Sequence, residues 1–321
     1  MTKRALITGV TGQDGSYLAD LLLAKGYEVY GIARQVSTIY GEQPRISHLM
    51  RNKSFHLHEG DITNYGSIVN AVGWAAPDEV YHLAAHSWVP GDPFCIWHTN
   101  THGTQCVLEA VRTTAPLARF YFAGSSEQFG NQPGLLPYHE LSAFKPMSTY
   151  AASKVTGWHL AHYYRRAYGM KVWCGLLFNH ESPRRSPQFV TRKITQGLAR
   201  VKAGKQQAIA LGSTKPTRDW GHAKDYVRAM HSMLQMDEPQ DFVIATGEEH
   251  TVDEFLTVAL TVVDLKSGCV YHNPDFVRDN EVHRLVGDPA RAQAILGWEP
   301  TVSFDELVKE MMLADMAREG L

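Results

Sequence analysis

The chain has 321 residues, which is long enough for one large α/β domain with a smaller lobe attached. Its 31 basic and 33 acidic residues nearly balance, so the chain lacks the broad basic surface of a nucleic-acid-binding protein. No apolar run is long enough to cross a bilayer, the N-terminus shows no signal-peptide pattern, and the 4 cysteines show no Cys-x-x-Cys spacing. We therefore expect a cytoplasmic protein with reduced cysteines, no bound metal, and neither nucleic acid nor a membrane as a partner.

Strand and helix patterns alternate through the first half of the chain. This alternation predicts an α/β fold with a doubly wound parallel sheet of the Rossmann type. We expect residues 1–178 to form a dinucleotide-binding domain and residues 179–321 a smaller C-terminal α/β lobe for the substrate, with parts of the sheet returning after residue 210. The apolar runs that indicate buried strands lie at residues 5–8, 27–33, 55–58, 79–83, 120–123 and 171–177.

A glycine-rich loop follows the first predicted strand and opens directly into a predicted helix over residues 16–25. Glycine at a tight turn lets a pyrophosphate approach the backbone N–H groups, and the start of a helix adds partial positive charge. The position of the loop within a strand–loop–helix unit favours a dinucleotide-binding loop over an ordinary glycine turn. The loop residues that we expect to bind the dinucleotide cofactor are Gly9, Thr11, Gly12, Gln13, Asp14 and Gly15.

The residues after the second and third predicted strands favour NADP over NAD. An NAD site usually has Asp or Glu at the end of the second strand, whereas this chain has Arg34, which could bind the 2′-phosphate or could be a solvated arginine. Asp61 is placed either to accept from the adenine amino group or to cap the following helix. Ile62 and the small residues after the fourth strand complete the expected cofactor contacts: Leu83, Ala84 and Ala85.

A tyrosine and a lysine one helical turn apart predict the catalytic centre. Tyr150 and Lys154 project from the same face of a helix that begins near residue 150, and Ser125 follows the fifth predicted strand. A lysine beside a phenol, together with an oxidised nicotinamide, lowers the pKa of the phenol and makes it a usable base. A Tyr/Lys pair on a helix surface is common by chance, so the dinucleotide loop and the strand-end serine are what favour a catalytic function.

Glu127 distinguishes between reaction types. A carboxylate beside a hydroxyl, a tyrosine and a lysine adds a second acid–base group, which would allow a proton to leave carbon and a hydroxyl to leave as water. Glu127 therefore favours elimination over simple alcohol oxidation. The alternative is that it caps a helix or forms an ion pair.

Several blocks along the whole chain resemble the GDP-mannose 4,6-dehydratase family. They lie at residues 9–18, 25–29, 177–185, 189–194, 218–227, 243–247 and 296–300, and Asn-His-Glu-Ser-Pro at 179–183 and Arg-Asp-Trp-Gly at 218–221 are the most specific. The resemblance implies that Ser125, Glu127, Tyr150 and Lys154 are catalytic and that His180 and Arg185 also contact the cofactor. The residues expected to contact a GDP-sugar are Ser126, Asn179, Val190, Arg192, Lys193, Arg218, Arg278 and Glu281.

Departures from the family pattern leave other activities open. Ser125 stands where the family generally has threonine, Arg34 is followed by Gln35 instead of a second basic residue, and the segment 84–95 and the residues after Arg278 also differ. These changes concern the sugar side of the site and the contacts between subunits. We expect the protein to form a homodimer or a homotetramer. The alternatives are a dehydratase for another GDP-sugar such as a GDP-manno-heptose, a GDP-4-keto-6-deoxy-sugar reductase or epimerase, and a catalytically silent NADP sensor.

Overall fold

A seven-stranded parallel sheet forms the centre of the computed structural model, which describes residues 2–34, 45–132, 134–276 and 282–321. The strand order is β11-β6-β5-β4-β1-β2-β3. This arrangement confirms the predicted doubly wound fold, and the six predicted strands are all present. The strands of this sheet are β1 (Arg4–Thr8), β2 (Glu28–Ala33), β3 (Phe55–Glu59), β4 (Glu79–His82), β5 (Arg119–Ala123), β6 (Val172–Leu177) and β11 (Asp241–Ile244).

Helices cover both faces of the sheet, because successive side chains of each strand point to opposite faces. On β5, Tyr121 faces the layer that contains α1 (Gln13–Ala24) and α8 (Ala223–Leu234), whereas Phe120 and Phe122 face the opposite layer. That opposite layer is formed by α3 (Tyr65–Ala75), α5 (Gly103–Thr114) and α6 (Thr149–Tyr168). The three aromatic side chains are fully or almost fully buried, so β5 is anchored from both sides.

The order of the strands reverses next to β1, which pairs with β2 on one side and with β4 on the other. At such a point the connecting loops diverge and leave a crevice outside the carboxyl ends of the strands. The glycine loop after β1 opens into this crevice. α1 begins at Gln13, slightly earlier than the predicted residue 16, so the last three residues of the loop, Gln13 to Gly15, already belong to the first helical turn.

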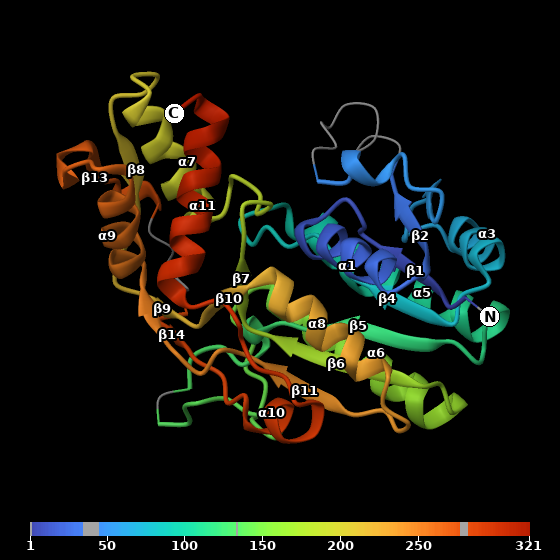
Figure 1. Ribbon diagram of the computed structural model, residues 1–321. Coiled ribbons are helices and arrows are strands. Elements are labelled where there is room, and N and C mark those ends of the chain that lie inside the picture. The colour runs from blue at the N-terminus through green and yellow to red at the C-terminus, as the bar shows by residue number, and fades with distance from the viewer. Residues whose placement is uncertain (1, 35–44, 133, 277–281) are drawn as a thin grey trace.

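A second layer of helices lies apart from the sheet around its own apolar core, as Figure 1 shows for α7 (Val190–Lys202), α9 (Val252–Val263) and α11 (Phe304–Glu319). The described residues also form small sheets: β7 (Asn179–Glu181) with β10 (Trp220–His222), β8 (Ile209–Leu211) with β13 (Val270–His272), and β9 (Thr217–Arg218) with β12 (His250–Thr251) and β14 (Arg284–Leu285). The chain enters this lobe after β7, returns to the large sheet for α8 and β11, and leaves it again.

The remaining helices are short. They are η1 (Ser47–Leu49), α4 (Pro93–Trp97), the π-helical η2 (His98–His102), η3 (Ser126–Gln128), η4 (Ser267–Cys269), η5 (Pro274–Phe276) and α10 (Ala290–Leu296). No helix in the described ranges is both long and apolar enough to cross a membrane.

Candidate active site

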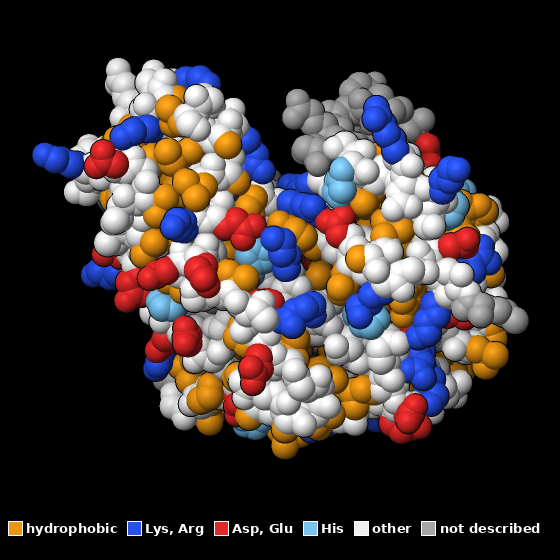
Figure 2. Space-filling model, viewed as in Figure 1, with side chains coloured by type: hydrophobic (Ala, Val, Ile, Leu, Met, Phe, Trp, Pro, Cys, Tyr) orange, Lys and Arg blue, Asp and Glu red, His pale blue; other side chains and the backbone are white. Residues whose placement is uncertain are grey.

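A cleft of about 1030 Å³ runs along the carboxyl ends of the strands and continues between the sheet and the α7–α11 lobe. Figure 2 shows the molecule notched between these two parts, with Lys and Arg side chains near the notch. Apart from Arg192, every predicted site residue in the described ranges lines this cleft. Arg278 and Glu281 lie outside the described residues.

The glycine loop has the geometry that a dinucleotide phosphate requires. α1 starts after Gly12, which provides no side-chain cap, so the first turn of the helix is open to an external acceptor. Gly9 has a φ of +75°, and a Cβ atom there would lie 2.8 Å from the backbone nitrogen of Ala84. A Cβ atom at Gly15 would lie 2.3 Å from the carbonyl oxygen of Gly9. Gly9 and Gly15 are therefore required by the packing of the loop itself, in addition to any approach of a phosphate.

Two side chains of the glycine loop tie it to β7. The amide of Gln13 donates to the carbonyl of His180 at 3.0 Å, and the carboxylate of Asp14 lies 2.8 Å from Nε2 of His180. Burial alone would raise the pKa of Asp14, but His180 and the Gln13 amide hold it below its ordinary value. Burial would likewise lower the pKa of His180, whereas Asp14 raises it above its ordinary value.

Ser125, Tyr150 and Lys154 meet where β5 ends against α6. The side chain of Ser125 lowers the pKa of the Tyr150 phenol, and Nζ of Lys154 donates to the carbonyl of Ala123 at 2.8 Å. α6 starts after Ser148, whose hydroxyl accepts from the backbone nitrogen of Ala151, and this cap fixes where the first turn presents Tyr150. The predicted cluster is therefore assembled in the cleft.

The pKa of Tyr150 lies above its ordinary value in this arrangement, although Lys154 is close by. Burial, opposed by Ser125 and assisted by the charge of Glu127, raises the pKa of the phenol to about 12. Nζ of Lys154 lies 6.0 Å from the centroid of the phenol ring, and burial lowers the pKa of Lys154 to about 8. The expectation that Lys154 activates the phenol thus requires additional positive charge in the cleft.

Glu127 is not the residue that caps the short helix η3. Ser125 is the N-cap, and its partner in the capping box is Gln128, whose side chain accepts from the backbone nitrogen of Ser125 at 2.8 Å. Glu127 lines the cleft beside Ser125. The capping alternative that the sequence left open is therefore wrong, and the acid–base function of Glu127 stays a prediction.

Arg192, predicted to contact the diphosphate, is engaged by protein groups and does not line the cleft. Its guanidinium is 7% exposed and forms two hydrogen bonds to Asp315, at 2.9 and 2.7 Å, and it donates to the carbonyls of Pro183 and Arg185. A cation whose donors are committed in this way serves to join α7 to α11. The neighbouring Lys193 does line the cleft, with its ammonium 3.9 Å from the centroid of the Phe276 ring.

Other predicted contacts lie in the cleft with partners of their own. Asp61 accepts from both the backbone nitrogen and the hydroxyl of Thr63 at 2.8 Å, whereas the cap of α3 is Asn64, so the capping alternative for Asp61 is wrong. Arg185 lies 3.1 Å from the carboxylate of Glu181 and packs over the ring of Phe189. Arg218 donates to the carbonyl of Thr217 at 2.9 Å.

Sequence reasoning missed several residues that line the cleft, including Arg45, His86, Trp88 and Phe276. His86 could have been found, because it directly follows the small residues after β4 that were expected to lie along the cofactor. Arg45 and Phe276 carry no such signal, since neither lies at the end of a strand of the large sheet.

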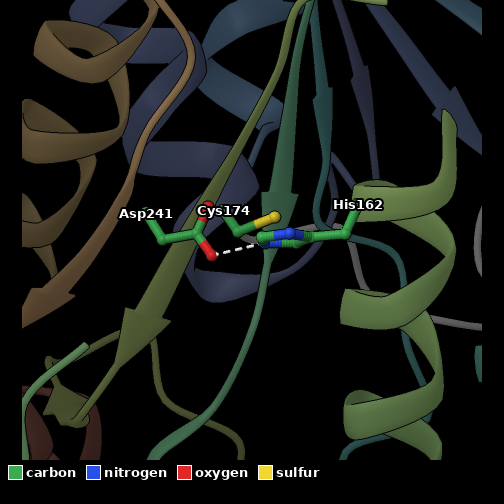
Figure 3. A group of neighbouring side chains, drawn as sticks. All are labelled: His162, Cys174 and Asp241. Atoms are coloured by element: carbon green, nitrogen blue, oxygen red, sulfur yellow. Dashed lines mark hydrogen bonds and ion pairs between the residues drawn. The ribbon is translucent and has the colours of Figure 1, made fainter. Parts of the chain in front are cut away.

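One group of side chains in the described ranges has the spacing of metal ligands. Figure 3 shows His162 projecting from α6 towards Cys174 on β6 and Asp241 on β11. The carboxylate of Asp241, however, also accepts from Nε1 of Trp158 at 2.6 Å and from Arg165 at 2.7 Å. Burial and the Asp241 charge raise the pKa of the Cys174 thiol well above its ordinary value. A cationic guanidinium and a protonated thiol disfavour a metal ion, and the group is better described as an ion-pair network that anchors β11.

Comparisons with known proteins agree with the family that the sequence resembles. The family model described as GDP-mannose 4,6 dehydratase matches residues 6–311. GDP-mannose 4,6-dehydratase of Vibrio cholerae is 42% identical over 98% of this chain and 94% of its own length. GDP-mannose 4,6 dehydratase of Homo sapiens is 42% identical over 97% of this chain and 91% of its own length.

Solved structures share the fold at lower identity. dTDP-glucose 4,6-dehydratase from Bacillus anthracis in complex with NAD superposes with a TM-score of 0.88 at 19% identity, covering 99% of this chain and 98% of its own. RMD from Pseudomonas aeruginosa complexed with NADPH has a TM-score of 0.81 at 22% identity and covers 98% of both chains. The family-model match and the full-length relatives confirm the resemblance noted in the sequence, and the chain belongs to the GDP-mannose 4,6-dehydratase family.

Proposed function

We propose that this protein removes water from GDP-mannose to give GDP-4-keto-6-deoxymannose, with NADP as its cofactor. The relatives that bear this activity in their names span almost the whole chain. The observation that carries the proposal is the grouping of Ser125, Glu127 and Tyr150 in the cleft, where both Ser125 and Glu127 affect the pKa of the Tyr150 phenol. An alcohol oxidoreductase needs the serine and the tyrosine, whereas elimination also needs the carboxylate.

The protein residues divide the acid–base work between two positions of the sugar. Tyr150 takes the proton of the C4 hydroxyl, while Ser125 holds both the phenol and the C4 oxygen by hydrogen bonds. Oxidation at C4 makes the C5 proton acidic, and Glu127 removes it and returns it to the hydroxyl that leaves C6 as water. NADP, when bound, supplies the acceptor and later the donor of one hydride, so the reaction consumes no reductant.

The pKa of Tyr150 links its role as a base to the cofactor. Burial raises this pKa to about 12, and Lys154 contacts the carbonyl of Ala123 and not the phenol, so the phenol alone is a poor base at neutral pH. The positive charge of an oxidised nicotinamide beside the ring favours the phenolate. We therefore expect the C4 hydroxyl to lose its proton, and C4 its hydride, only when GDP-mannose and the oxidised cofactor are bound together.

Arg34 supports NADP as the specific cofactor. It follows β2, where an NAD site would carry an acidic side chain, and it lines the cleft at the end where the glycine loop begins α1. A guanidinium suits the 2′-phosphate because it forms charge-assisted hydrogen bonds with phosphate oxygens. On the substrate side, Lys193 and Arg218 remain the described cations proposed to contact the GDP diphosphate.

A panel of GDP-sugars tests the proposal directly. Purified protein is incubated with GDP-mannose and with related GDP-sugars, including a GDP-manno-heptose, and product masses are measured with and without added NADPH. Loss of one water from GDP-mannose without net consumption of NADPH is the expected result, and Tyr150→Phe serves as the inactive control. Stoichiometric NADPH oxidation would identify a reductase, and preferential turnover of another GDP-sugar would replace GDP-mannose as the substrate.

A further inference from the structure

Arg45 bridges the two loops that form the cofactor end of the cleft. Its Nε donates to the carbonyl of Arg184 at 2.6 Å, and Nη1 reaches the carbonyl of Thr11 in the glycine loop at 3.4 Å. Nη2 contacts the hydroxyl of Ser186 at 3.2 Å. Arg45 also lines the cleft. Its guanidinium is therefore fixed in place between the glycine loop and the loop after β7.

Positive charge is concentrated around this guanidinium. Burial lowers the pKa of Arg45, and the charges of Arg192, Arg185, Arg318 and Arg184 lower it further. These four arginines have acidic partners of their own. Arg184 pairs with Asp20 at 2.8 Å and Arg185 with Glu181 at 3.1 Å, while Arg192 and Arg318 share Asp315 at 2.7 and 2.6 Å.

The contacts that the described residues make with Arg45 are of a different kind. Its acceptors there are two carbonyl oxygens and one hydroxyl, none of which carries a charge. A guanidinium has more N–H donors than these three contacts use, and a partly buried cation without a charged acceptor is costly. The arrangement is complete only with an anion in the cleft, next to the start of α1 where the helix adds its own partial positive charge.

We infer that Arg45 is a phosphate ligand of the bound dinucleotide, held ready by the carbonyls of Thr11 and Arg184. The inference rests on the proposed binding of NADP. The contact with Thr11 places Arg45 beside the loop that meets the cofactor, which favours the dinucleotide over the GDP-sugar. NADP has phosphate oxygens in its pyrophosphate and in its 2′-phosphate. NAD has the pyrophosphate but lacks the 2′-phosphate, so comparing the binding of the two dinucleotides shows which group Arg45 contacts.

Binding measurements on Arg45 variants test this inference. Dissociation constants of NADP, NAD and GDP-mannose are measured by calorimetry for the wild type, Arg45→Gln and Arg45→Lys. Loss of a charged hydrogen bond to phosphate corresponds to roughly 10- to 100-fold weaker binding. We expect Arg45→Gln to weaken the binding of NADP by about this factor, and the affinity of Arg45→Lys should lie between those of Arg45→Gln and the wild type. The binding of NADP should also depend less steeply on salt concentration in Arg45→Gln.

Arg318→Gln is the matched control, because it removes one charge from the same cluster outside the residues that line the cleft. If Arg45 acts by direct contact with a phosphate, and not through the combined positive charge of the arginine cluster, Arg318→Gln should leave the affinity for NADP within about twofold of the wild type. Weaker binding of NADP alone would assign Arg45 to the 2′-phosphate, and weaker binding of both dinucleotides would assign it to the pyrophosphate.

Three results would overturn the inference. Unchanged affinity for both dinucleotides in Arg45→Gln would show that Arg45 does not contact the cofactor. Weaker binding of GDP-mannose alone would show that Arg45 contacts the substrate instead. A similar loss of affinity for all three ligands, together with a lower melting temperature, would show that Arg45 only holds the loops together. A wild-type protein that binds neither dinucleotide would instead refute the proposed cofactor itself.

Discussion

The carboxylate of Asp14, in the glycine loop, lies 2.8 Å from Nε2 of His180, which belongs to β7 at the start of the second lobe. The opposite ring nitrogen of His180 contacts the carbonyl of Phe178 at 2.7 Å, so both nitrogens carry a proton when the ring is charged. This buried pair joins the loop that meets the cofactor to the segment from which the substrate lobe continues.

The pair predicts an unusual titration of His180. Asp14 raises the pKa of His180 against the effect of burial, so in Asp14→Asn, where burial remains and the charge is gone, the pKa should fall below the ordinary value of histidine. NMR titration of the imidazole in the two proteins measures this shift. Equal pKa values in wild type and variant would show that the pair does not exist in solution.

The same pair makes stability depend on pH in a defined direction. The contribution of the pair to the free energy of unfolding should be greatest between the ordinary pKa values of an aspartate and a histidine. It should be lost as pH rises through the raised pKa of His180. It should also be lost as pH falls through the lowered pKa of Asp14. The difference in unfolding free energy between the wild type and Asp14→Asn, measured from pH 4 to 9 by denaturant titration, should therefore shrink towards the alkaline end, and a constant difference would contradict this.

The ion pair between Arg192 and Asp315 predicts a loss of stability without a loss of substrate binding. Both side chains are almost fully buried, so Asp315→Ala leaves a buried guanidinium without its carboxylate and should cost about 3–5 kcal/mol of unfolding free energy. Asp305→Ala, at an exposed position of the same helix, should cost less than about 1 kcal/mol. Should Arg192→Met raise the KM for GDP-mannose while stability stays unchanged, Arg192 would be a substrate contact after all.

Asp241 should stabilise the edge of the sheet mainly through its charge. Its carboxylate accepts from Trp158, His162 and Arg165, and these interactions hold its pKa below the ordinary value although burial would raise it. Asp241→Asn should therefore lower the unfolding free energy by about 1.5–3 kcal/mol near neutral pH. The difference should diminish as pH falls through the lowered pKa of Asp241, because the wild type then loses its charge too. A difference that grows on acidification would contradict this assignment.

The account of cofactor choice depends on Arg34. Arg34→Ala should weaken NADP by roughly 10- to 100-fold and leave NAD nearly unchanged, because only NADP carries the phosphate that the guanidinium would meet. Fluorescence titration of both dinucleotides measures the two affinities. Equal losses for NADP and NAD, or no loss for either, would remove the argument for NADP at this position.

The sequence predicted the strands and the site residues that lie at their ends. Runs such as Phe120-Tyr-Phe122 have only one favourable environment, between two layers of helices, and parallel strands bring Ser125 and Glu127 to the same edge as the glycine loop. Helical spacing places Tyr150 and Lys154 on one face, and the glycine loop and Ser125 are what favour a catalytic function for the pair. The subunit number and the boundary near residue 178 remain predictions.

Partners far apart in the sequence could not be predicted. The resemblance assigns Arg192 to the GDP-sugar pocket, and its ion pair with Asp315, 123 positions away on another helix, has no signal in the sequence. Glu127 and Asp61 could each have been caps, and only the geometry shows that Gln128 and Asn64 do that work. Arg45 lies in a stretch without periodicity, and its contacts with Thr11 and Arg184 exist only in the folded chain.

The central claim is that Tyr150 and Glu127 serve separate steps, and a single-turnover experiment tests it most directly. GDP-mannose is mixed with excess enzyme and NADP⁺ in deuterated water, while NADPH absorbance, deuterium at C5 and product mass are followed for the wild type, Tyr150→Phe and Glu127→Gln. A positioned acid–base group contributes about 10²–10⁴-fold, so Glu127→Gln should still form NADPH but exchange C5 and lose water that much more slowly. Tyr150→Phe should fail to form NADPH. If Glu127→Gln exchanges C5 and eliminates water near the wild-type rate, Glu127 is not the base and the proposed mechanism is wrong.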